Sequence, residues 1–312
     1  MNAQEIYLVV NSNPWQALVP LYIFFKGLSV GALCISALFT VFRSERFKRL
    51  ALPAALTSLI AFIPAPILLL ADLHQPLRFW HLFVNFNPTS AISWGTWLII
   101  LYPLCLLWYI ARLGMSQGIS LPLLKGVQES ASASQGQRSS GLSLRGVSVL
   151  TLVLALLADL YTAFLLGVVK GKVLWNSALL PGYFLASALV TGTALVLIVY
   201  LYKKPEEKTV QTLARIIQGT LVLELFFAFS QWITLYATNL QGQKTVELLW
   251  HDPKYLIGDI FLGILLPIVL LMRPSVNKKT ILTISALLVI LGGLLLRFSI
   301  VDIGIQAAAL WN

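Results

Sequence analysis

The sequence predicts an all-α, polytopic integral membrane protein with eight transmembrane helices arranged as two four-helix bundles. Of its 312 residues, 58% are hydrophobic and only 11% are charged, a balance that a soluble chain of this length does not show. Eight apolar stretches each reach the roughly 20 residues that cross a bilayer, and backbone in lipid must satisfy its own hydrogen bonds, which favours helices. The predicted spans are about 16–42, 50–72, 91–113, 144–168, 177–202, 212–238, 254–272 and 279–300.

The joints between these spans differ strongly in charge from one side to the other. Fifteen of the 22 basic residues fall on one side and six on the other, while Lys26 lies inside the first span. The positive-inside rule makes the basic side cytoplasmic, so we expect both termini on the periplasmic side of a bacterial inner membrane. The net charge of +10 then reflects topology, and we expect no nucleic-acid partner.

The first two spans carry polar residues and prolines. No basic segment precedes span 16–42, so we expect a retained helix rather than a cleaved signal peptide. Tyr22 precedes Lys26 by four positions and shares its helix face. The second span contains Pro64 and Pro66, which predict a kink.

The outward joint at 72–90 is rich in aromatic and polar residues. Pro88 presets a turn, and Thr89 or Ser90 can cap the third span by accepting from its free amides. One interpretation is a docking loop for a partner. The other is a membrane-surface anchor, in which Trp80 belongs to an interfacial aromatic belt.

The cytoplasmic joint at 114–143 is rich in Ser, Gly and Gln, a composition typical of a flexible linker. It separates spans that we expect to pack together. The expected organisation is 1–113 for spans one to three, 114–143 for the linker, 144–176 for a fourth span that completes the first bundle, and 177–312 for spans five to eight.

Ionisable side chains inside spans are costly in lipid and are therefore candidate functional residues. One set gathers at a single outward depth, with His74 able to overhang it. Its hydroxyl, ammonium and carboxylate groups could bond to and exchange protons with a quinone head group. The alternative is a Lys26–Asp159 ion pair that only stabilises the bundle. The members of this set are Tyr22, Lys26, Asp72, Asp159 and Tyr161.

A second polar set lies in the last three spans. Asp259 and Arg297 have similar depths, which suggests an ion pair, while Glu224 lies near the middle of its span. A carboxylate there is protonated, paired or part of a proton route. Both interpretations, ion pair and proton route, stay open for this set.

Histidines and cysteines are few and poorly placed for cofactors. All three histidines lie in outward joints, whereas a haem would need axial ligands inside the spans. Cys34 and Cys105 lie in separate spans without ligand spacing. We therefore expect no haem, no iron–sulfur cluster and no metal on this chain.

Several blocks resemble the NrfD/polysulfide reductase membrane-subunit family. The Asn-Pro-Thr-Ser block and the Leu-Trp-Asn block at this separation are the most specific, and the similarity extends over spans one to five. The last three spans match only in hydropathy and number. The blocks that resemble the family are 27–31, 72–80, 85–90, 93–97, 159–166 and 173–177.

The resemblance implies an eight-helix membrane anchor that binds menaquinone or another quinone near the periplasmic face. In this family the quinone contacts come from span one and a tyrosine in span four, which corresponds to Tyr161. The span-one histidine and the asparagine three residues before it correspond to Tyr22 and Val19, two departures from the pattern. The implied quinone-binding residues are thus Tyr22, Lys26 and Tyr161, and the implied proton-exchanging residues are Asp159, Asp72 and His74.

The family also implies partners. A ferredoxin-like iron–sulfur subunit would dock on the outward joint and pass electrons to a molybdopterin catalytic subunit or a multihaem cytochrome, so the terminal substrate is bound elsewhere. Two alternatives remain: a secondary transporter or permease, for which we find no internal repeat, and a structural anchor without quinone chemistry. The candidate docking residues are Arg78, Trp80, Asn85, Asn87, Pro88, Thr89 and Ser90.

Overall fold

A computed structural model describes residues 15–72, 80–84, 87, 90–119, 126, 143–169, 171–203, 205–272 and 279–309. Within these residues the regular structure is entirely helical. Eight helices are long and apolar enough to cross a membrane: 17–40, 45–72, 92–116, 144–167, 180–201, 207–238, 254–272 and 279–307. The predicted all-α, eight-span architecture is confirmed. Most of the predicted linker at 114–143 and parts of the outward joint lie outside the described residues.

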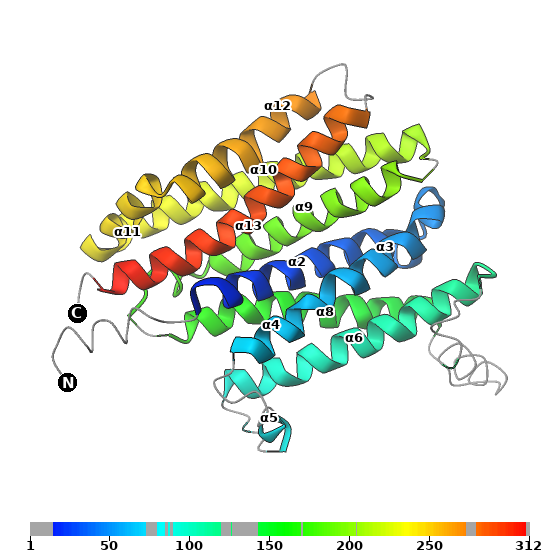
Figure 1. The fold of residues 1–312 in the computed structure, drawn as a ribbon, viewed down its shortest axis with the longest axis horizontal. Coiled ribbons are helices and arrows are strands. Elements are labelled where there is room, and N and C mark those ends of the chain that lie inside the picture. The colour runs from blue at the N-terminus through cyan, green and yellow to red at the C-terminus, as the bar shows by residue number, and fades with distance from the viewer. Residues whose placement is uncertain are drawn as a thin grey trace.

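The first four spans form one bundle (Figure 1). In it α2 packs against α3, α4 and α8, and α6 packs against α3 and α8. Its elements are α2 (Trp15–Thr40), η1 (Glu45–Phe47), α3 (Lys48–Phe62), α4 (Pro64–Asp72), α5 (His81–Val84), α6 (Ala91–Ser116) and α8 (Leu144–Gly167).

The last four spans form the second bundle, in which α9 packs against α10 and α13, and α13 packs against η4. The 12-residue segment η4 has the wider π-helical winding. The elements are α9 (Leu180–Leu201), α10 (Glu207–Thr238), α11 (Leu240–His251), η4 (Lys254–Leu265), α12 (Leu266–Met272) and α13 (Lys279–Ala309).

Small residues let the two bundles approach closely. α2 contacts both α9 and α13 of the second bundle. At the α2–α9 crossing, a Cβ on Gly31 would overlap the Ala188 carbonyl oxygen, and a Cβ on Gly192 would overlap the backbone at Gly31. Only glycine allows backbones this close, so these positions determine how tightly the halves join.

Successive spans run in opposite directions. We call the two ends of the molecule the Trp15 end and the Thr40 end, and α2 begins at the same end at which α13 finishes (Figure 1). The Trp15 end carries the helix termini at Trp15, Asp72, Ala91, Gly167, Leu180, Thr238, Lys254 and Ala309. The joints with few basic residues belong to this end.

The break in the second span was predicted, whereas the additional helix α11 was not. The second span is interrupted at Ile63, between α3 and α4, as its prolines predicted. In contrast, α11 was not predicted, because the joint between spans six and seven was interpreted as a simple connection. Asn239 caps α11 by accepting from the Gly242 amide at 2.8 Å, and the helix buries Val246 and Leu249 on one face.

Hydroxyl networks connect the helices of the first bundle. The Ser29 hydroxyl lies 3.0 Å from that of Ser58 and 2.7 Å from that of Tyr102, joining α2, α3 and α6. Nearer the Thr40 end, the Thr40 hydroxyl lies 3.2 Å from that of Tyr109, which joins α2 and α6 again. These buried groups satisfy one another, and they hold the helices that carry the candidate site.

Candidate functional site

Lys26 is buried between α2 and α8. Its Nζ donates to the Ala158 main-chain carbonyl at 2.5 Å and lies 5.1 Å from the centre of the Tyr22 ring. A buried ammonium group is costly unless it is hydrogen-bonded and close to negative charge. Ala158 directly precedes Asp159, so this hydrogen bond holds the Lys26 ammonium group close to the Asp159 carboxylate.

Asp159 is also buried, and its Oδ2 has no hydrogen-bond partner among the residues that the structure describes. Its charge neighbours are Lys26 and Arg297. Both groups lie close to Gly27: a Cβ added to this glycine would be 3.5 Å from Asp159 Oδ1 and 3.3 Å from an Arg297 nitrogen. Yet among the ion pairs of the described residues, none within 4.0 Å joins Lys26 to Asp159. The Asp159 carboxylate therefore lies near two positive charges, those of Lys26 and Arg297, but forms no direct ion pair with either among the described residues.

Tyr161 follows Asp159 by two residues in α8, and its side chain points toward α6. Its side chain is half-buried, and its ring packs directly over Gly95 of α6, where a Cβ would overlap it. The Tyr22 hydroxyl lies near Thr162 and Tyr161. Tyr22 of α2 therefore lies near Lys26 of the same helix and near Asp159 and Tyr161 of α8.

The outer residues of the predicted site are only partly described. Asp72 ends α4 and is half-buried. Trp80 is 50% exposed and stacks on His81 with ring centres 3.8 Å apart. His74, Arg78, Asn85, Pro88 and Thr89 lie outside the described residues.

The start of α6 follows the expected turn. Ser90 occupies the N-cap position with extended backbone, but its side chain makes no capping hydrogen bond. Instead the Asn87 amide donates to the Ser93 hydroxyl at 3.2 Å. The joint is therefore tied to the first turn of the helix by Ser93, a residue that the sequence did not mark as functional.

A second buried polar cluster lies in the other bundle. Tyr183 of α9 donates to Asp259 Oδ2 of η4 at 3.2 Å, and Trp232 of α10 donates to the Tyr255 hydroxyl at 2.8 Å. Glu224 is buried and is a charge neighbour of Asp259. The sequence did not predict that Tyr183, Tyr255 and Trp232 belong to this cluster, because tyrosine and tryptophan are common in membrane helices.

Arg297 lies between the two clusters. Its guanidinium donates to the Ser187 hydroxyl, to the Gly293 carbonyl at 2.8 Å and to the Phe184 carbonyl at 3.4 Å. No ion pair within 4.0 Å links it to Asp259 among the described residues. Its charge neighbours are Glu224, Asp159 and Asp259, so it faces carboxylates of both bundles. From its predicted depth in the membrane, the sequence had grouped Arg297 only with Asp259 and Glu224.

The Leu-Trp-Asn block has a structural role. Trp175 Nε1 donates to the Ile300 carbonyl at 2.9 Å, and the indole ring packs against Gly304. Asn176 donates to the carbonyls of Val169 and Lys172, each at 3.0 Å. These bonds hold the joint after α8 against α13 at the Trp15 end.

Two helical bundles with buried charges near their common interface define a multi-pass membrane subunit with a polar intramembrane site. Within the described ranges, no group of three or more His, Cys, Asp or Glu side chains could hold a metal ion. The family model described as Polysulphide reductase, NrfD, matches residues 9–309, and the chain belongs to this family.

Three relatives show how the family is used. A selenate reductase subunit of Mesobacillus selenatarsenatis is 28% identical over 92% of this chain and 73% of its own length. A polysulfide reductase chain of Wolinella succinogenes is 26% identical over 94% of this chain and 95% of its own. An Hdr-like menaquinol oxidoreductase integral membrane subunit of Archaeoglobus fulgidus is 27% identical over 85% of this chain and 64% of its own. These relatives are membrane subunits of oxidoreductase complexes, which supports the same anchoring role here.

Proposed function

We propose that this chain is the quinone-reactive membrane subunit of a respiratory oxidoreductase. Quinol is oxidised between α2, α6 and α8 near the Trp15 end, which we assign to the periplasmic side. The electrons pass to a ferredoxin-like iron–sulfur subunit docked on the 72–90 joint, and from there to a molybdopterin catalytic subunit or a multihaem cytochrome. The same site run in reverse would reduce a quinone.

The observation that most supports this proposal is the Oδ2 of buried Asp159, which has no hydrogen-bond partner among the described residues and lies close to Lys26 and Tyr22. A buried carboxylate oxygen without a partner is unusual and is typical of a group that acts on a proton. The relative named as a menaquinol oxidoreductase subunit supports quinol as the substrate class.

In the proposed mechanism, Tyr22 and Tyr161 hydrogen-bond the oxygens of the quinol ring. Asp159 accepts a proton, and Lys26 stabilises the negative charge on Asp159 between turnovers. Each quinol gives up two protons and two electrons; Asp72 and His74 lead the protons toward water at the Trp15 end. Half-burial of Tyr161 supports an opening to the surface there.

The second cluster suits a proton route. Glu224 of α10 and Asp259 of η4 are buried carboxylates, each near the middle of its helix, and Arg297 faces them as well as Asp159. We propose that this set exchanges protons with the first site. The observation that favours this role over a purely structural one is the lack of a direct Asp259–Arg297 ion pair among the described residues.

Quinol-dependent turnover of the assembled complex tests the proposal. Asp159→Asn and Tyr161→Phe should each lower turnover by about tenfold or more, since a positioned acid or base typically contributes about a hundredfold or more. Matched controls at the Thr40 end are Glu45→Gln, of an exposed carboxylate, and Tyr202→Phe, of a tyrosine that is 74% exposed.

Copurification of the partner subunits verifies assembly of each variant. Turnover unchanged in both site variants would refute the quinone site and leave the structural anchor. Cation uptake by vesicles containing the chain alone would favour the transporter.

A further inference from the structure

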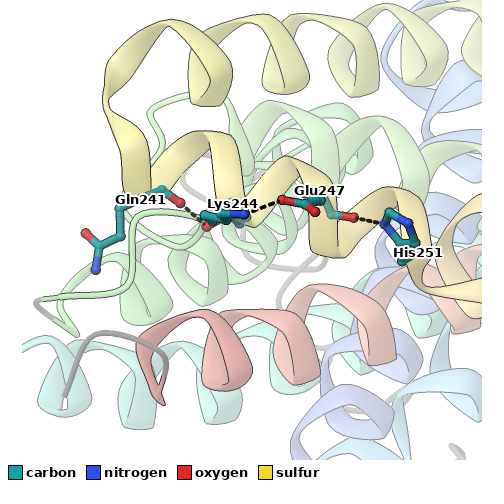
Figure 2. Close-up of polar contacts among 5 residues, drawn as sticks. Gln241, Lys244, Glu247 and His251 are labelled. Atoms are coloured by element: carbon teal, nitrogen blue, oxygen red, sulfur yellow. Dashed lines mark hydrogen bonds and ion pairs between the residues drawn. The ribbon is translucent and has the colours of Figure 1, made fainter.

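A groove at the Trp15 end lies outside the proposed quinone site. It has a volume of about 710 Å³ and runs between the end of α10 and α11. Figure 2 shows α11 beside α10, with Gln241, Lys244, Glu247 and His251 along one side of the helix. Neither this helix nor this groove was predicted from the sequence.

The wall of the groove is apolar and aromatic. Phe229, Ile233 and Tyr236 of α10 are 56%, 54% and 63% exposed, and Trp250 of α11 is 55% exposed. In a membrane-spanning helix, large apolar side chains that face outward contact lipid chains, and Trp and Tyr concentrate at the depth of the head groups. The groove therefore lies where acyl chains meet the polar surface.

The rim of the groove carries opposite charges side by side. Lys244 Nζ lies 2.9 Å from Glu247 Oε2, and both side chains are more than half exposed. His251 Nδ1 lies 2.7 Å from the Glu247 main-chain oxygen; a carbonyl can only accept, so Nδ1 donates and Nε2 of the neutral ring is left as an acceptor. The rim thus offers one cation, one anion and one neutral acceptor.

This charge pattern selects among membrane molecules. A phosphate would bond to Lys244, and a primary ammonium would bond to Glu247 and to the His251 acceptor. A head group with only negative charge would meet Glu247 unfavourably, and a quinone ring has no charged group to bond to the Lys244–Glu247 pair. A zwitterionic head group carrying both phosphate and ammonium complements the rim.

We propose that the α10–α11 groove binds one molecule of phosphatidylethanolamine, with its acyl chains along α10 and its head group on Lys244 and Glu247. Because α11 also packs against α13 and η4, a lipid bound here would brace α11 against the second bundle. The site is independent of the quinone chemistry proposed above.

Native mass spectrometry of the delipidated full-length chain tests this proposal. The probes are phosphatidylethanolamine, phosphatidylglycerol and menaquinone, each added separately. Phosphatidylethanolamine should bind about fivefold more tightly than phosphatidylglycerol, and Lys244→Gln should weaken it by a similar factor, the scale expected for one lysine at a lipid surface. Lys208→Gln, at the Thr40 end, is the matched control and should have no effect.

A second variant tests the groove without touching its charges. Ala237 lines the groove, so Ala237→Phe should block the acyl chains and abolish the preference for phosphatidylethanolamine. Phe226 supplies the control, because it is 61% exposed on α10 but does not line the groove; Phe226→Ala should bind normally. Equal binding of both phospholipids, preferential binding of menaquinone, or full binding by Ala237→Phe would each overturn the assignment.

Discussion

Lys26 lies beside Asp159, yet it donates to the neighbouring Ala158 carbonyl at 2.5 Å rather than forming a direct ion pair with the carboxylate. The main chain of α8 thus holds the ammonium group, and no described residue hydrogen-bonds to Asp159 Oδ2. A salt bridge would tie up the carboxylate, whereas this arrangement supplies a positive charge and leaves the oxygen accessible to a proton. This arrangement fits the proton-accepting role proposed for Asp159.

Lys26→Met should destabilise the protein by about 1–3 kcal/mol, because it removes the buried hydrogen bond to Ala158 and a positive charge close to the buried Asp159 carboxylate. Adding Asp159→Asn should recover much of that stability but not quinol-dependent turnover. Thermal denaturation in detergent and turnover of the assembled complex measure the two effects. If the double variant recovered turnover together with stability, the pair would have only a structural role.

Gly31→Ala should destabilise the junction between the bundles by about 1–3 kcal/mol, because the added Cβ overlaps the Ala188 carbonyl oxygen. Gly219→Ala in α10 is the matched control: a Cβ there meets nothing within 4 Å, so the change should be neutral or stabilising by up to about 1 kcal/mol. Denaturation midpoints of the two variants give the comparison. Equal midpoints would contradict the close α2–α9 crossing.

Glu247 should make a small, pH-dependent contribution to stability. The hydrogen bond from Lys244, and then its charge, lower the pKa of Glu247 below its usual 4.5. A lowered pKa favours the charged form in the folded protein, so the contribution is present above pH 4.5 and is lost as the pH falls through the folded-state pKa. The stability difference between the natural protein and Glu247→Gln should therefore shrink in acid.

High salt should shrink the same difference at neutral pH, because the pair is exposed and screened. Denaturation midpoints of both proteins, measured across pH and ionic strength, provide the test. A difference that persisted well below pH 4.5 would show that the carboxylate charge is not its cause.

Deleting residues 86–90 should release the iron–sulfur partner without unfolding the bundle. The proposed docking joint precedes α6, and the Asn87 amide is tied to the first turn of that helix through Ser93. Copurification of the partner measures the loss, and a deletion of residues 130–134, in the predicted linker, is the control. Partner binding that survived the first deletion would rule out this joint as the docking surface.

Hydropathy predicted the spans closely because each transmembrane helix must be apolar along its own length, a constraint that is local in the sequence. Periodicity and depth predicted that Tyr22, Lys26, Asp159 and Tyr161 lie toward one end. In the structure Lys26 bonds to the main chain of α8, and Tyr22 lies near Asp159 and Tyr161 of that helix. The amphipathic helix α11 was missed, because its polar face made the joint look like an ordinary hydrophilic connection.

The position of Arg297 could not be predicted, since it depends on a charge neighbour in the other bundle, Asp159, and on space left by Gly27 and Gly293. Sequence depth suggested an ion pair with Asp259; Asp259 is a charge neighbour, but no ion pair within 4.0 Å joins the two among the described residues. Depth alone does not say which way a side chain turns around its helix. The hydrogen bonds to the Ser187 hydroxyl and the Phe184 carbonyl decide that direction.

By itself, the sequence determined that this protein is an eight-span membrane subunit, which ionisable groups lie inside the spans, and which joints carry the basic residues. Each of those properties can be read from one segment at a time, because it depends on the free energy of transferring that segment into lipid. Only the tertiary structure decided that Arg297 faces both carboxylate sets, that one oxygen of Asp159 has no partner in the described part of the chain, and that α11 forms a groove with α10. Those relationships depend on rotation and close approach of helices distant in sequence, which side-chain packing determines.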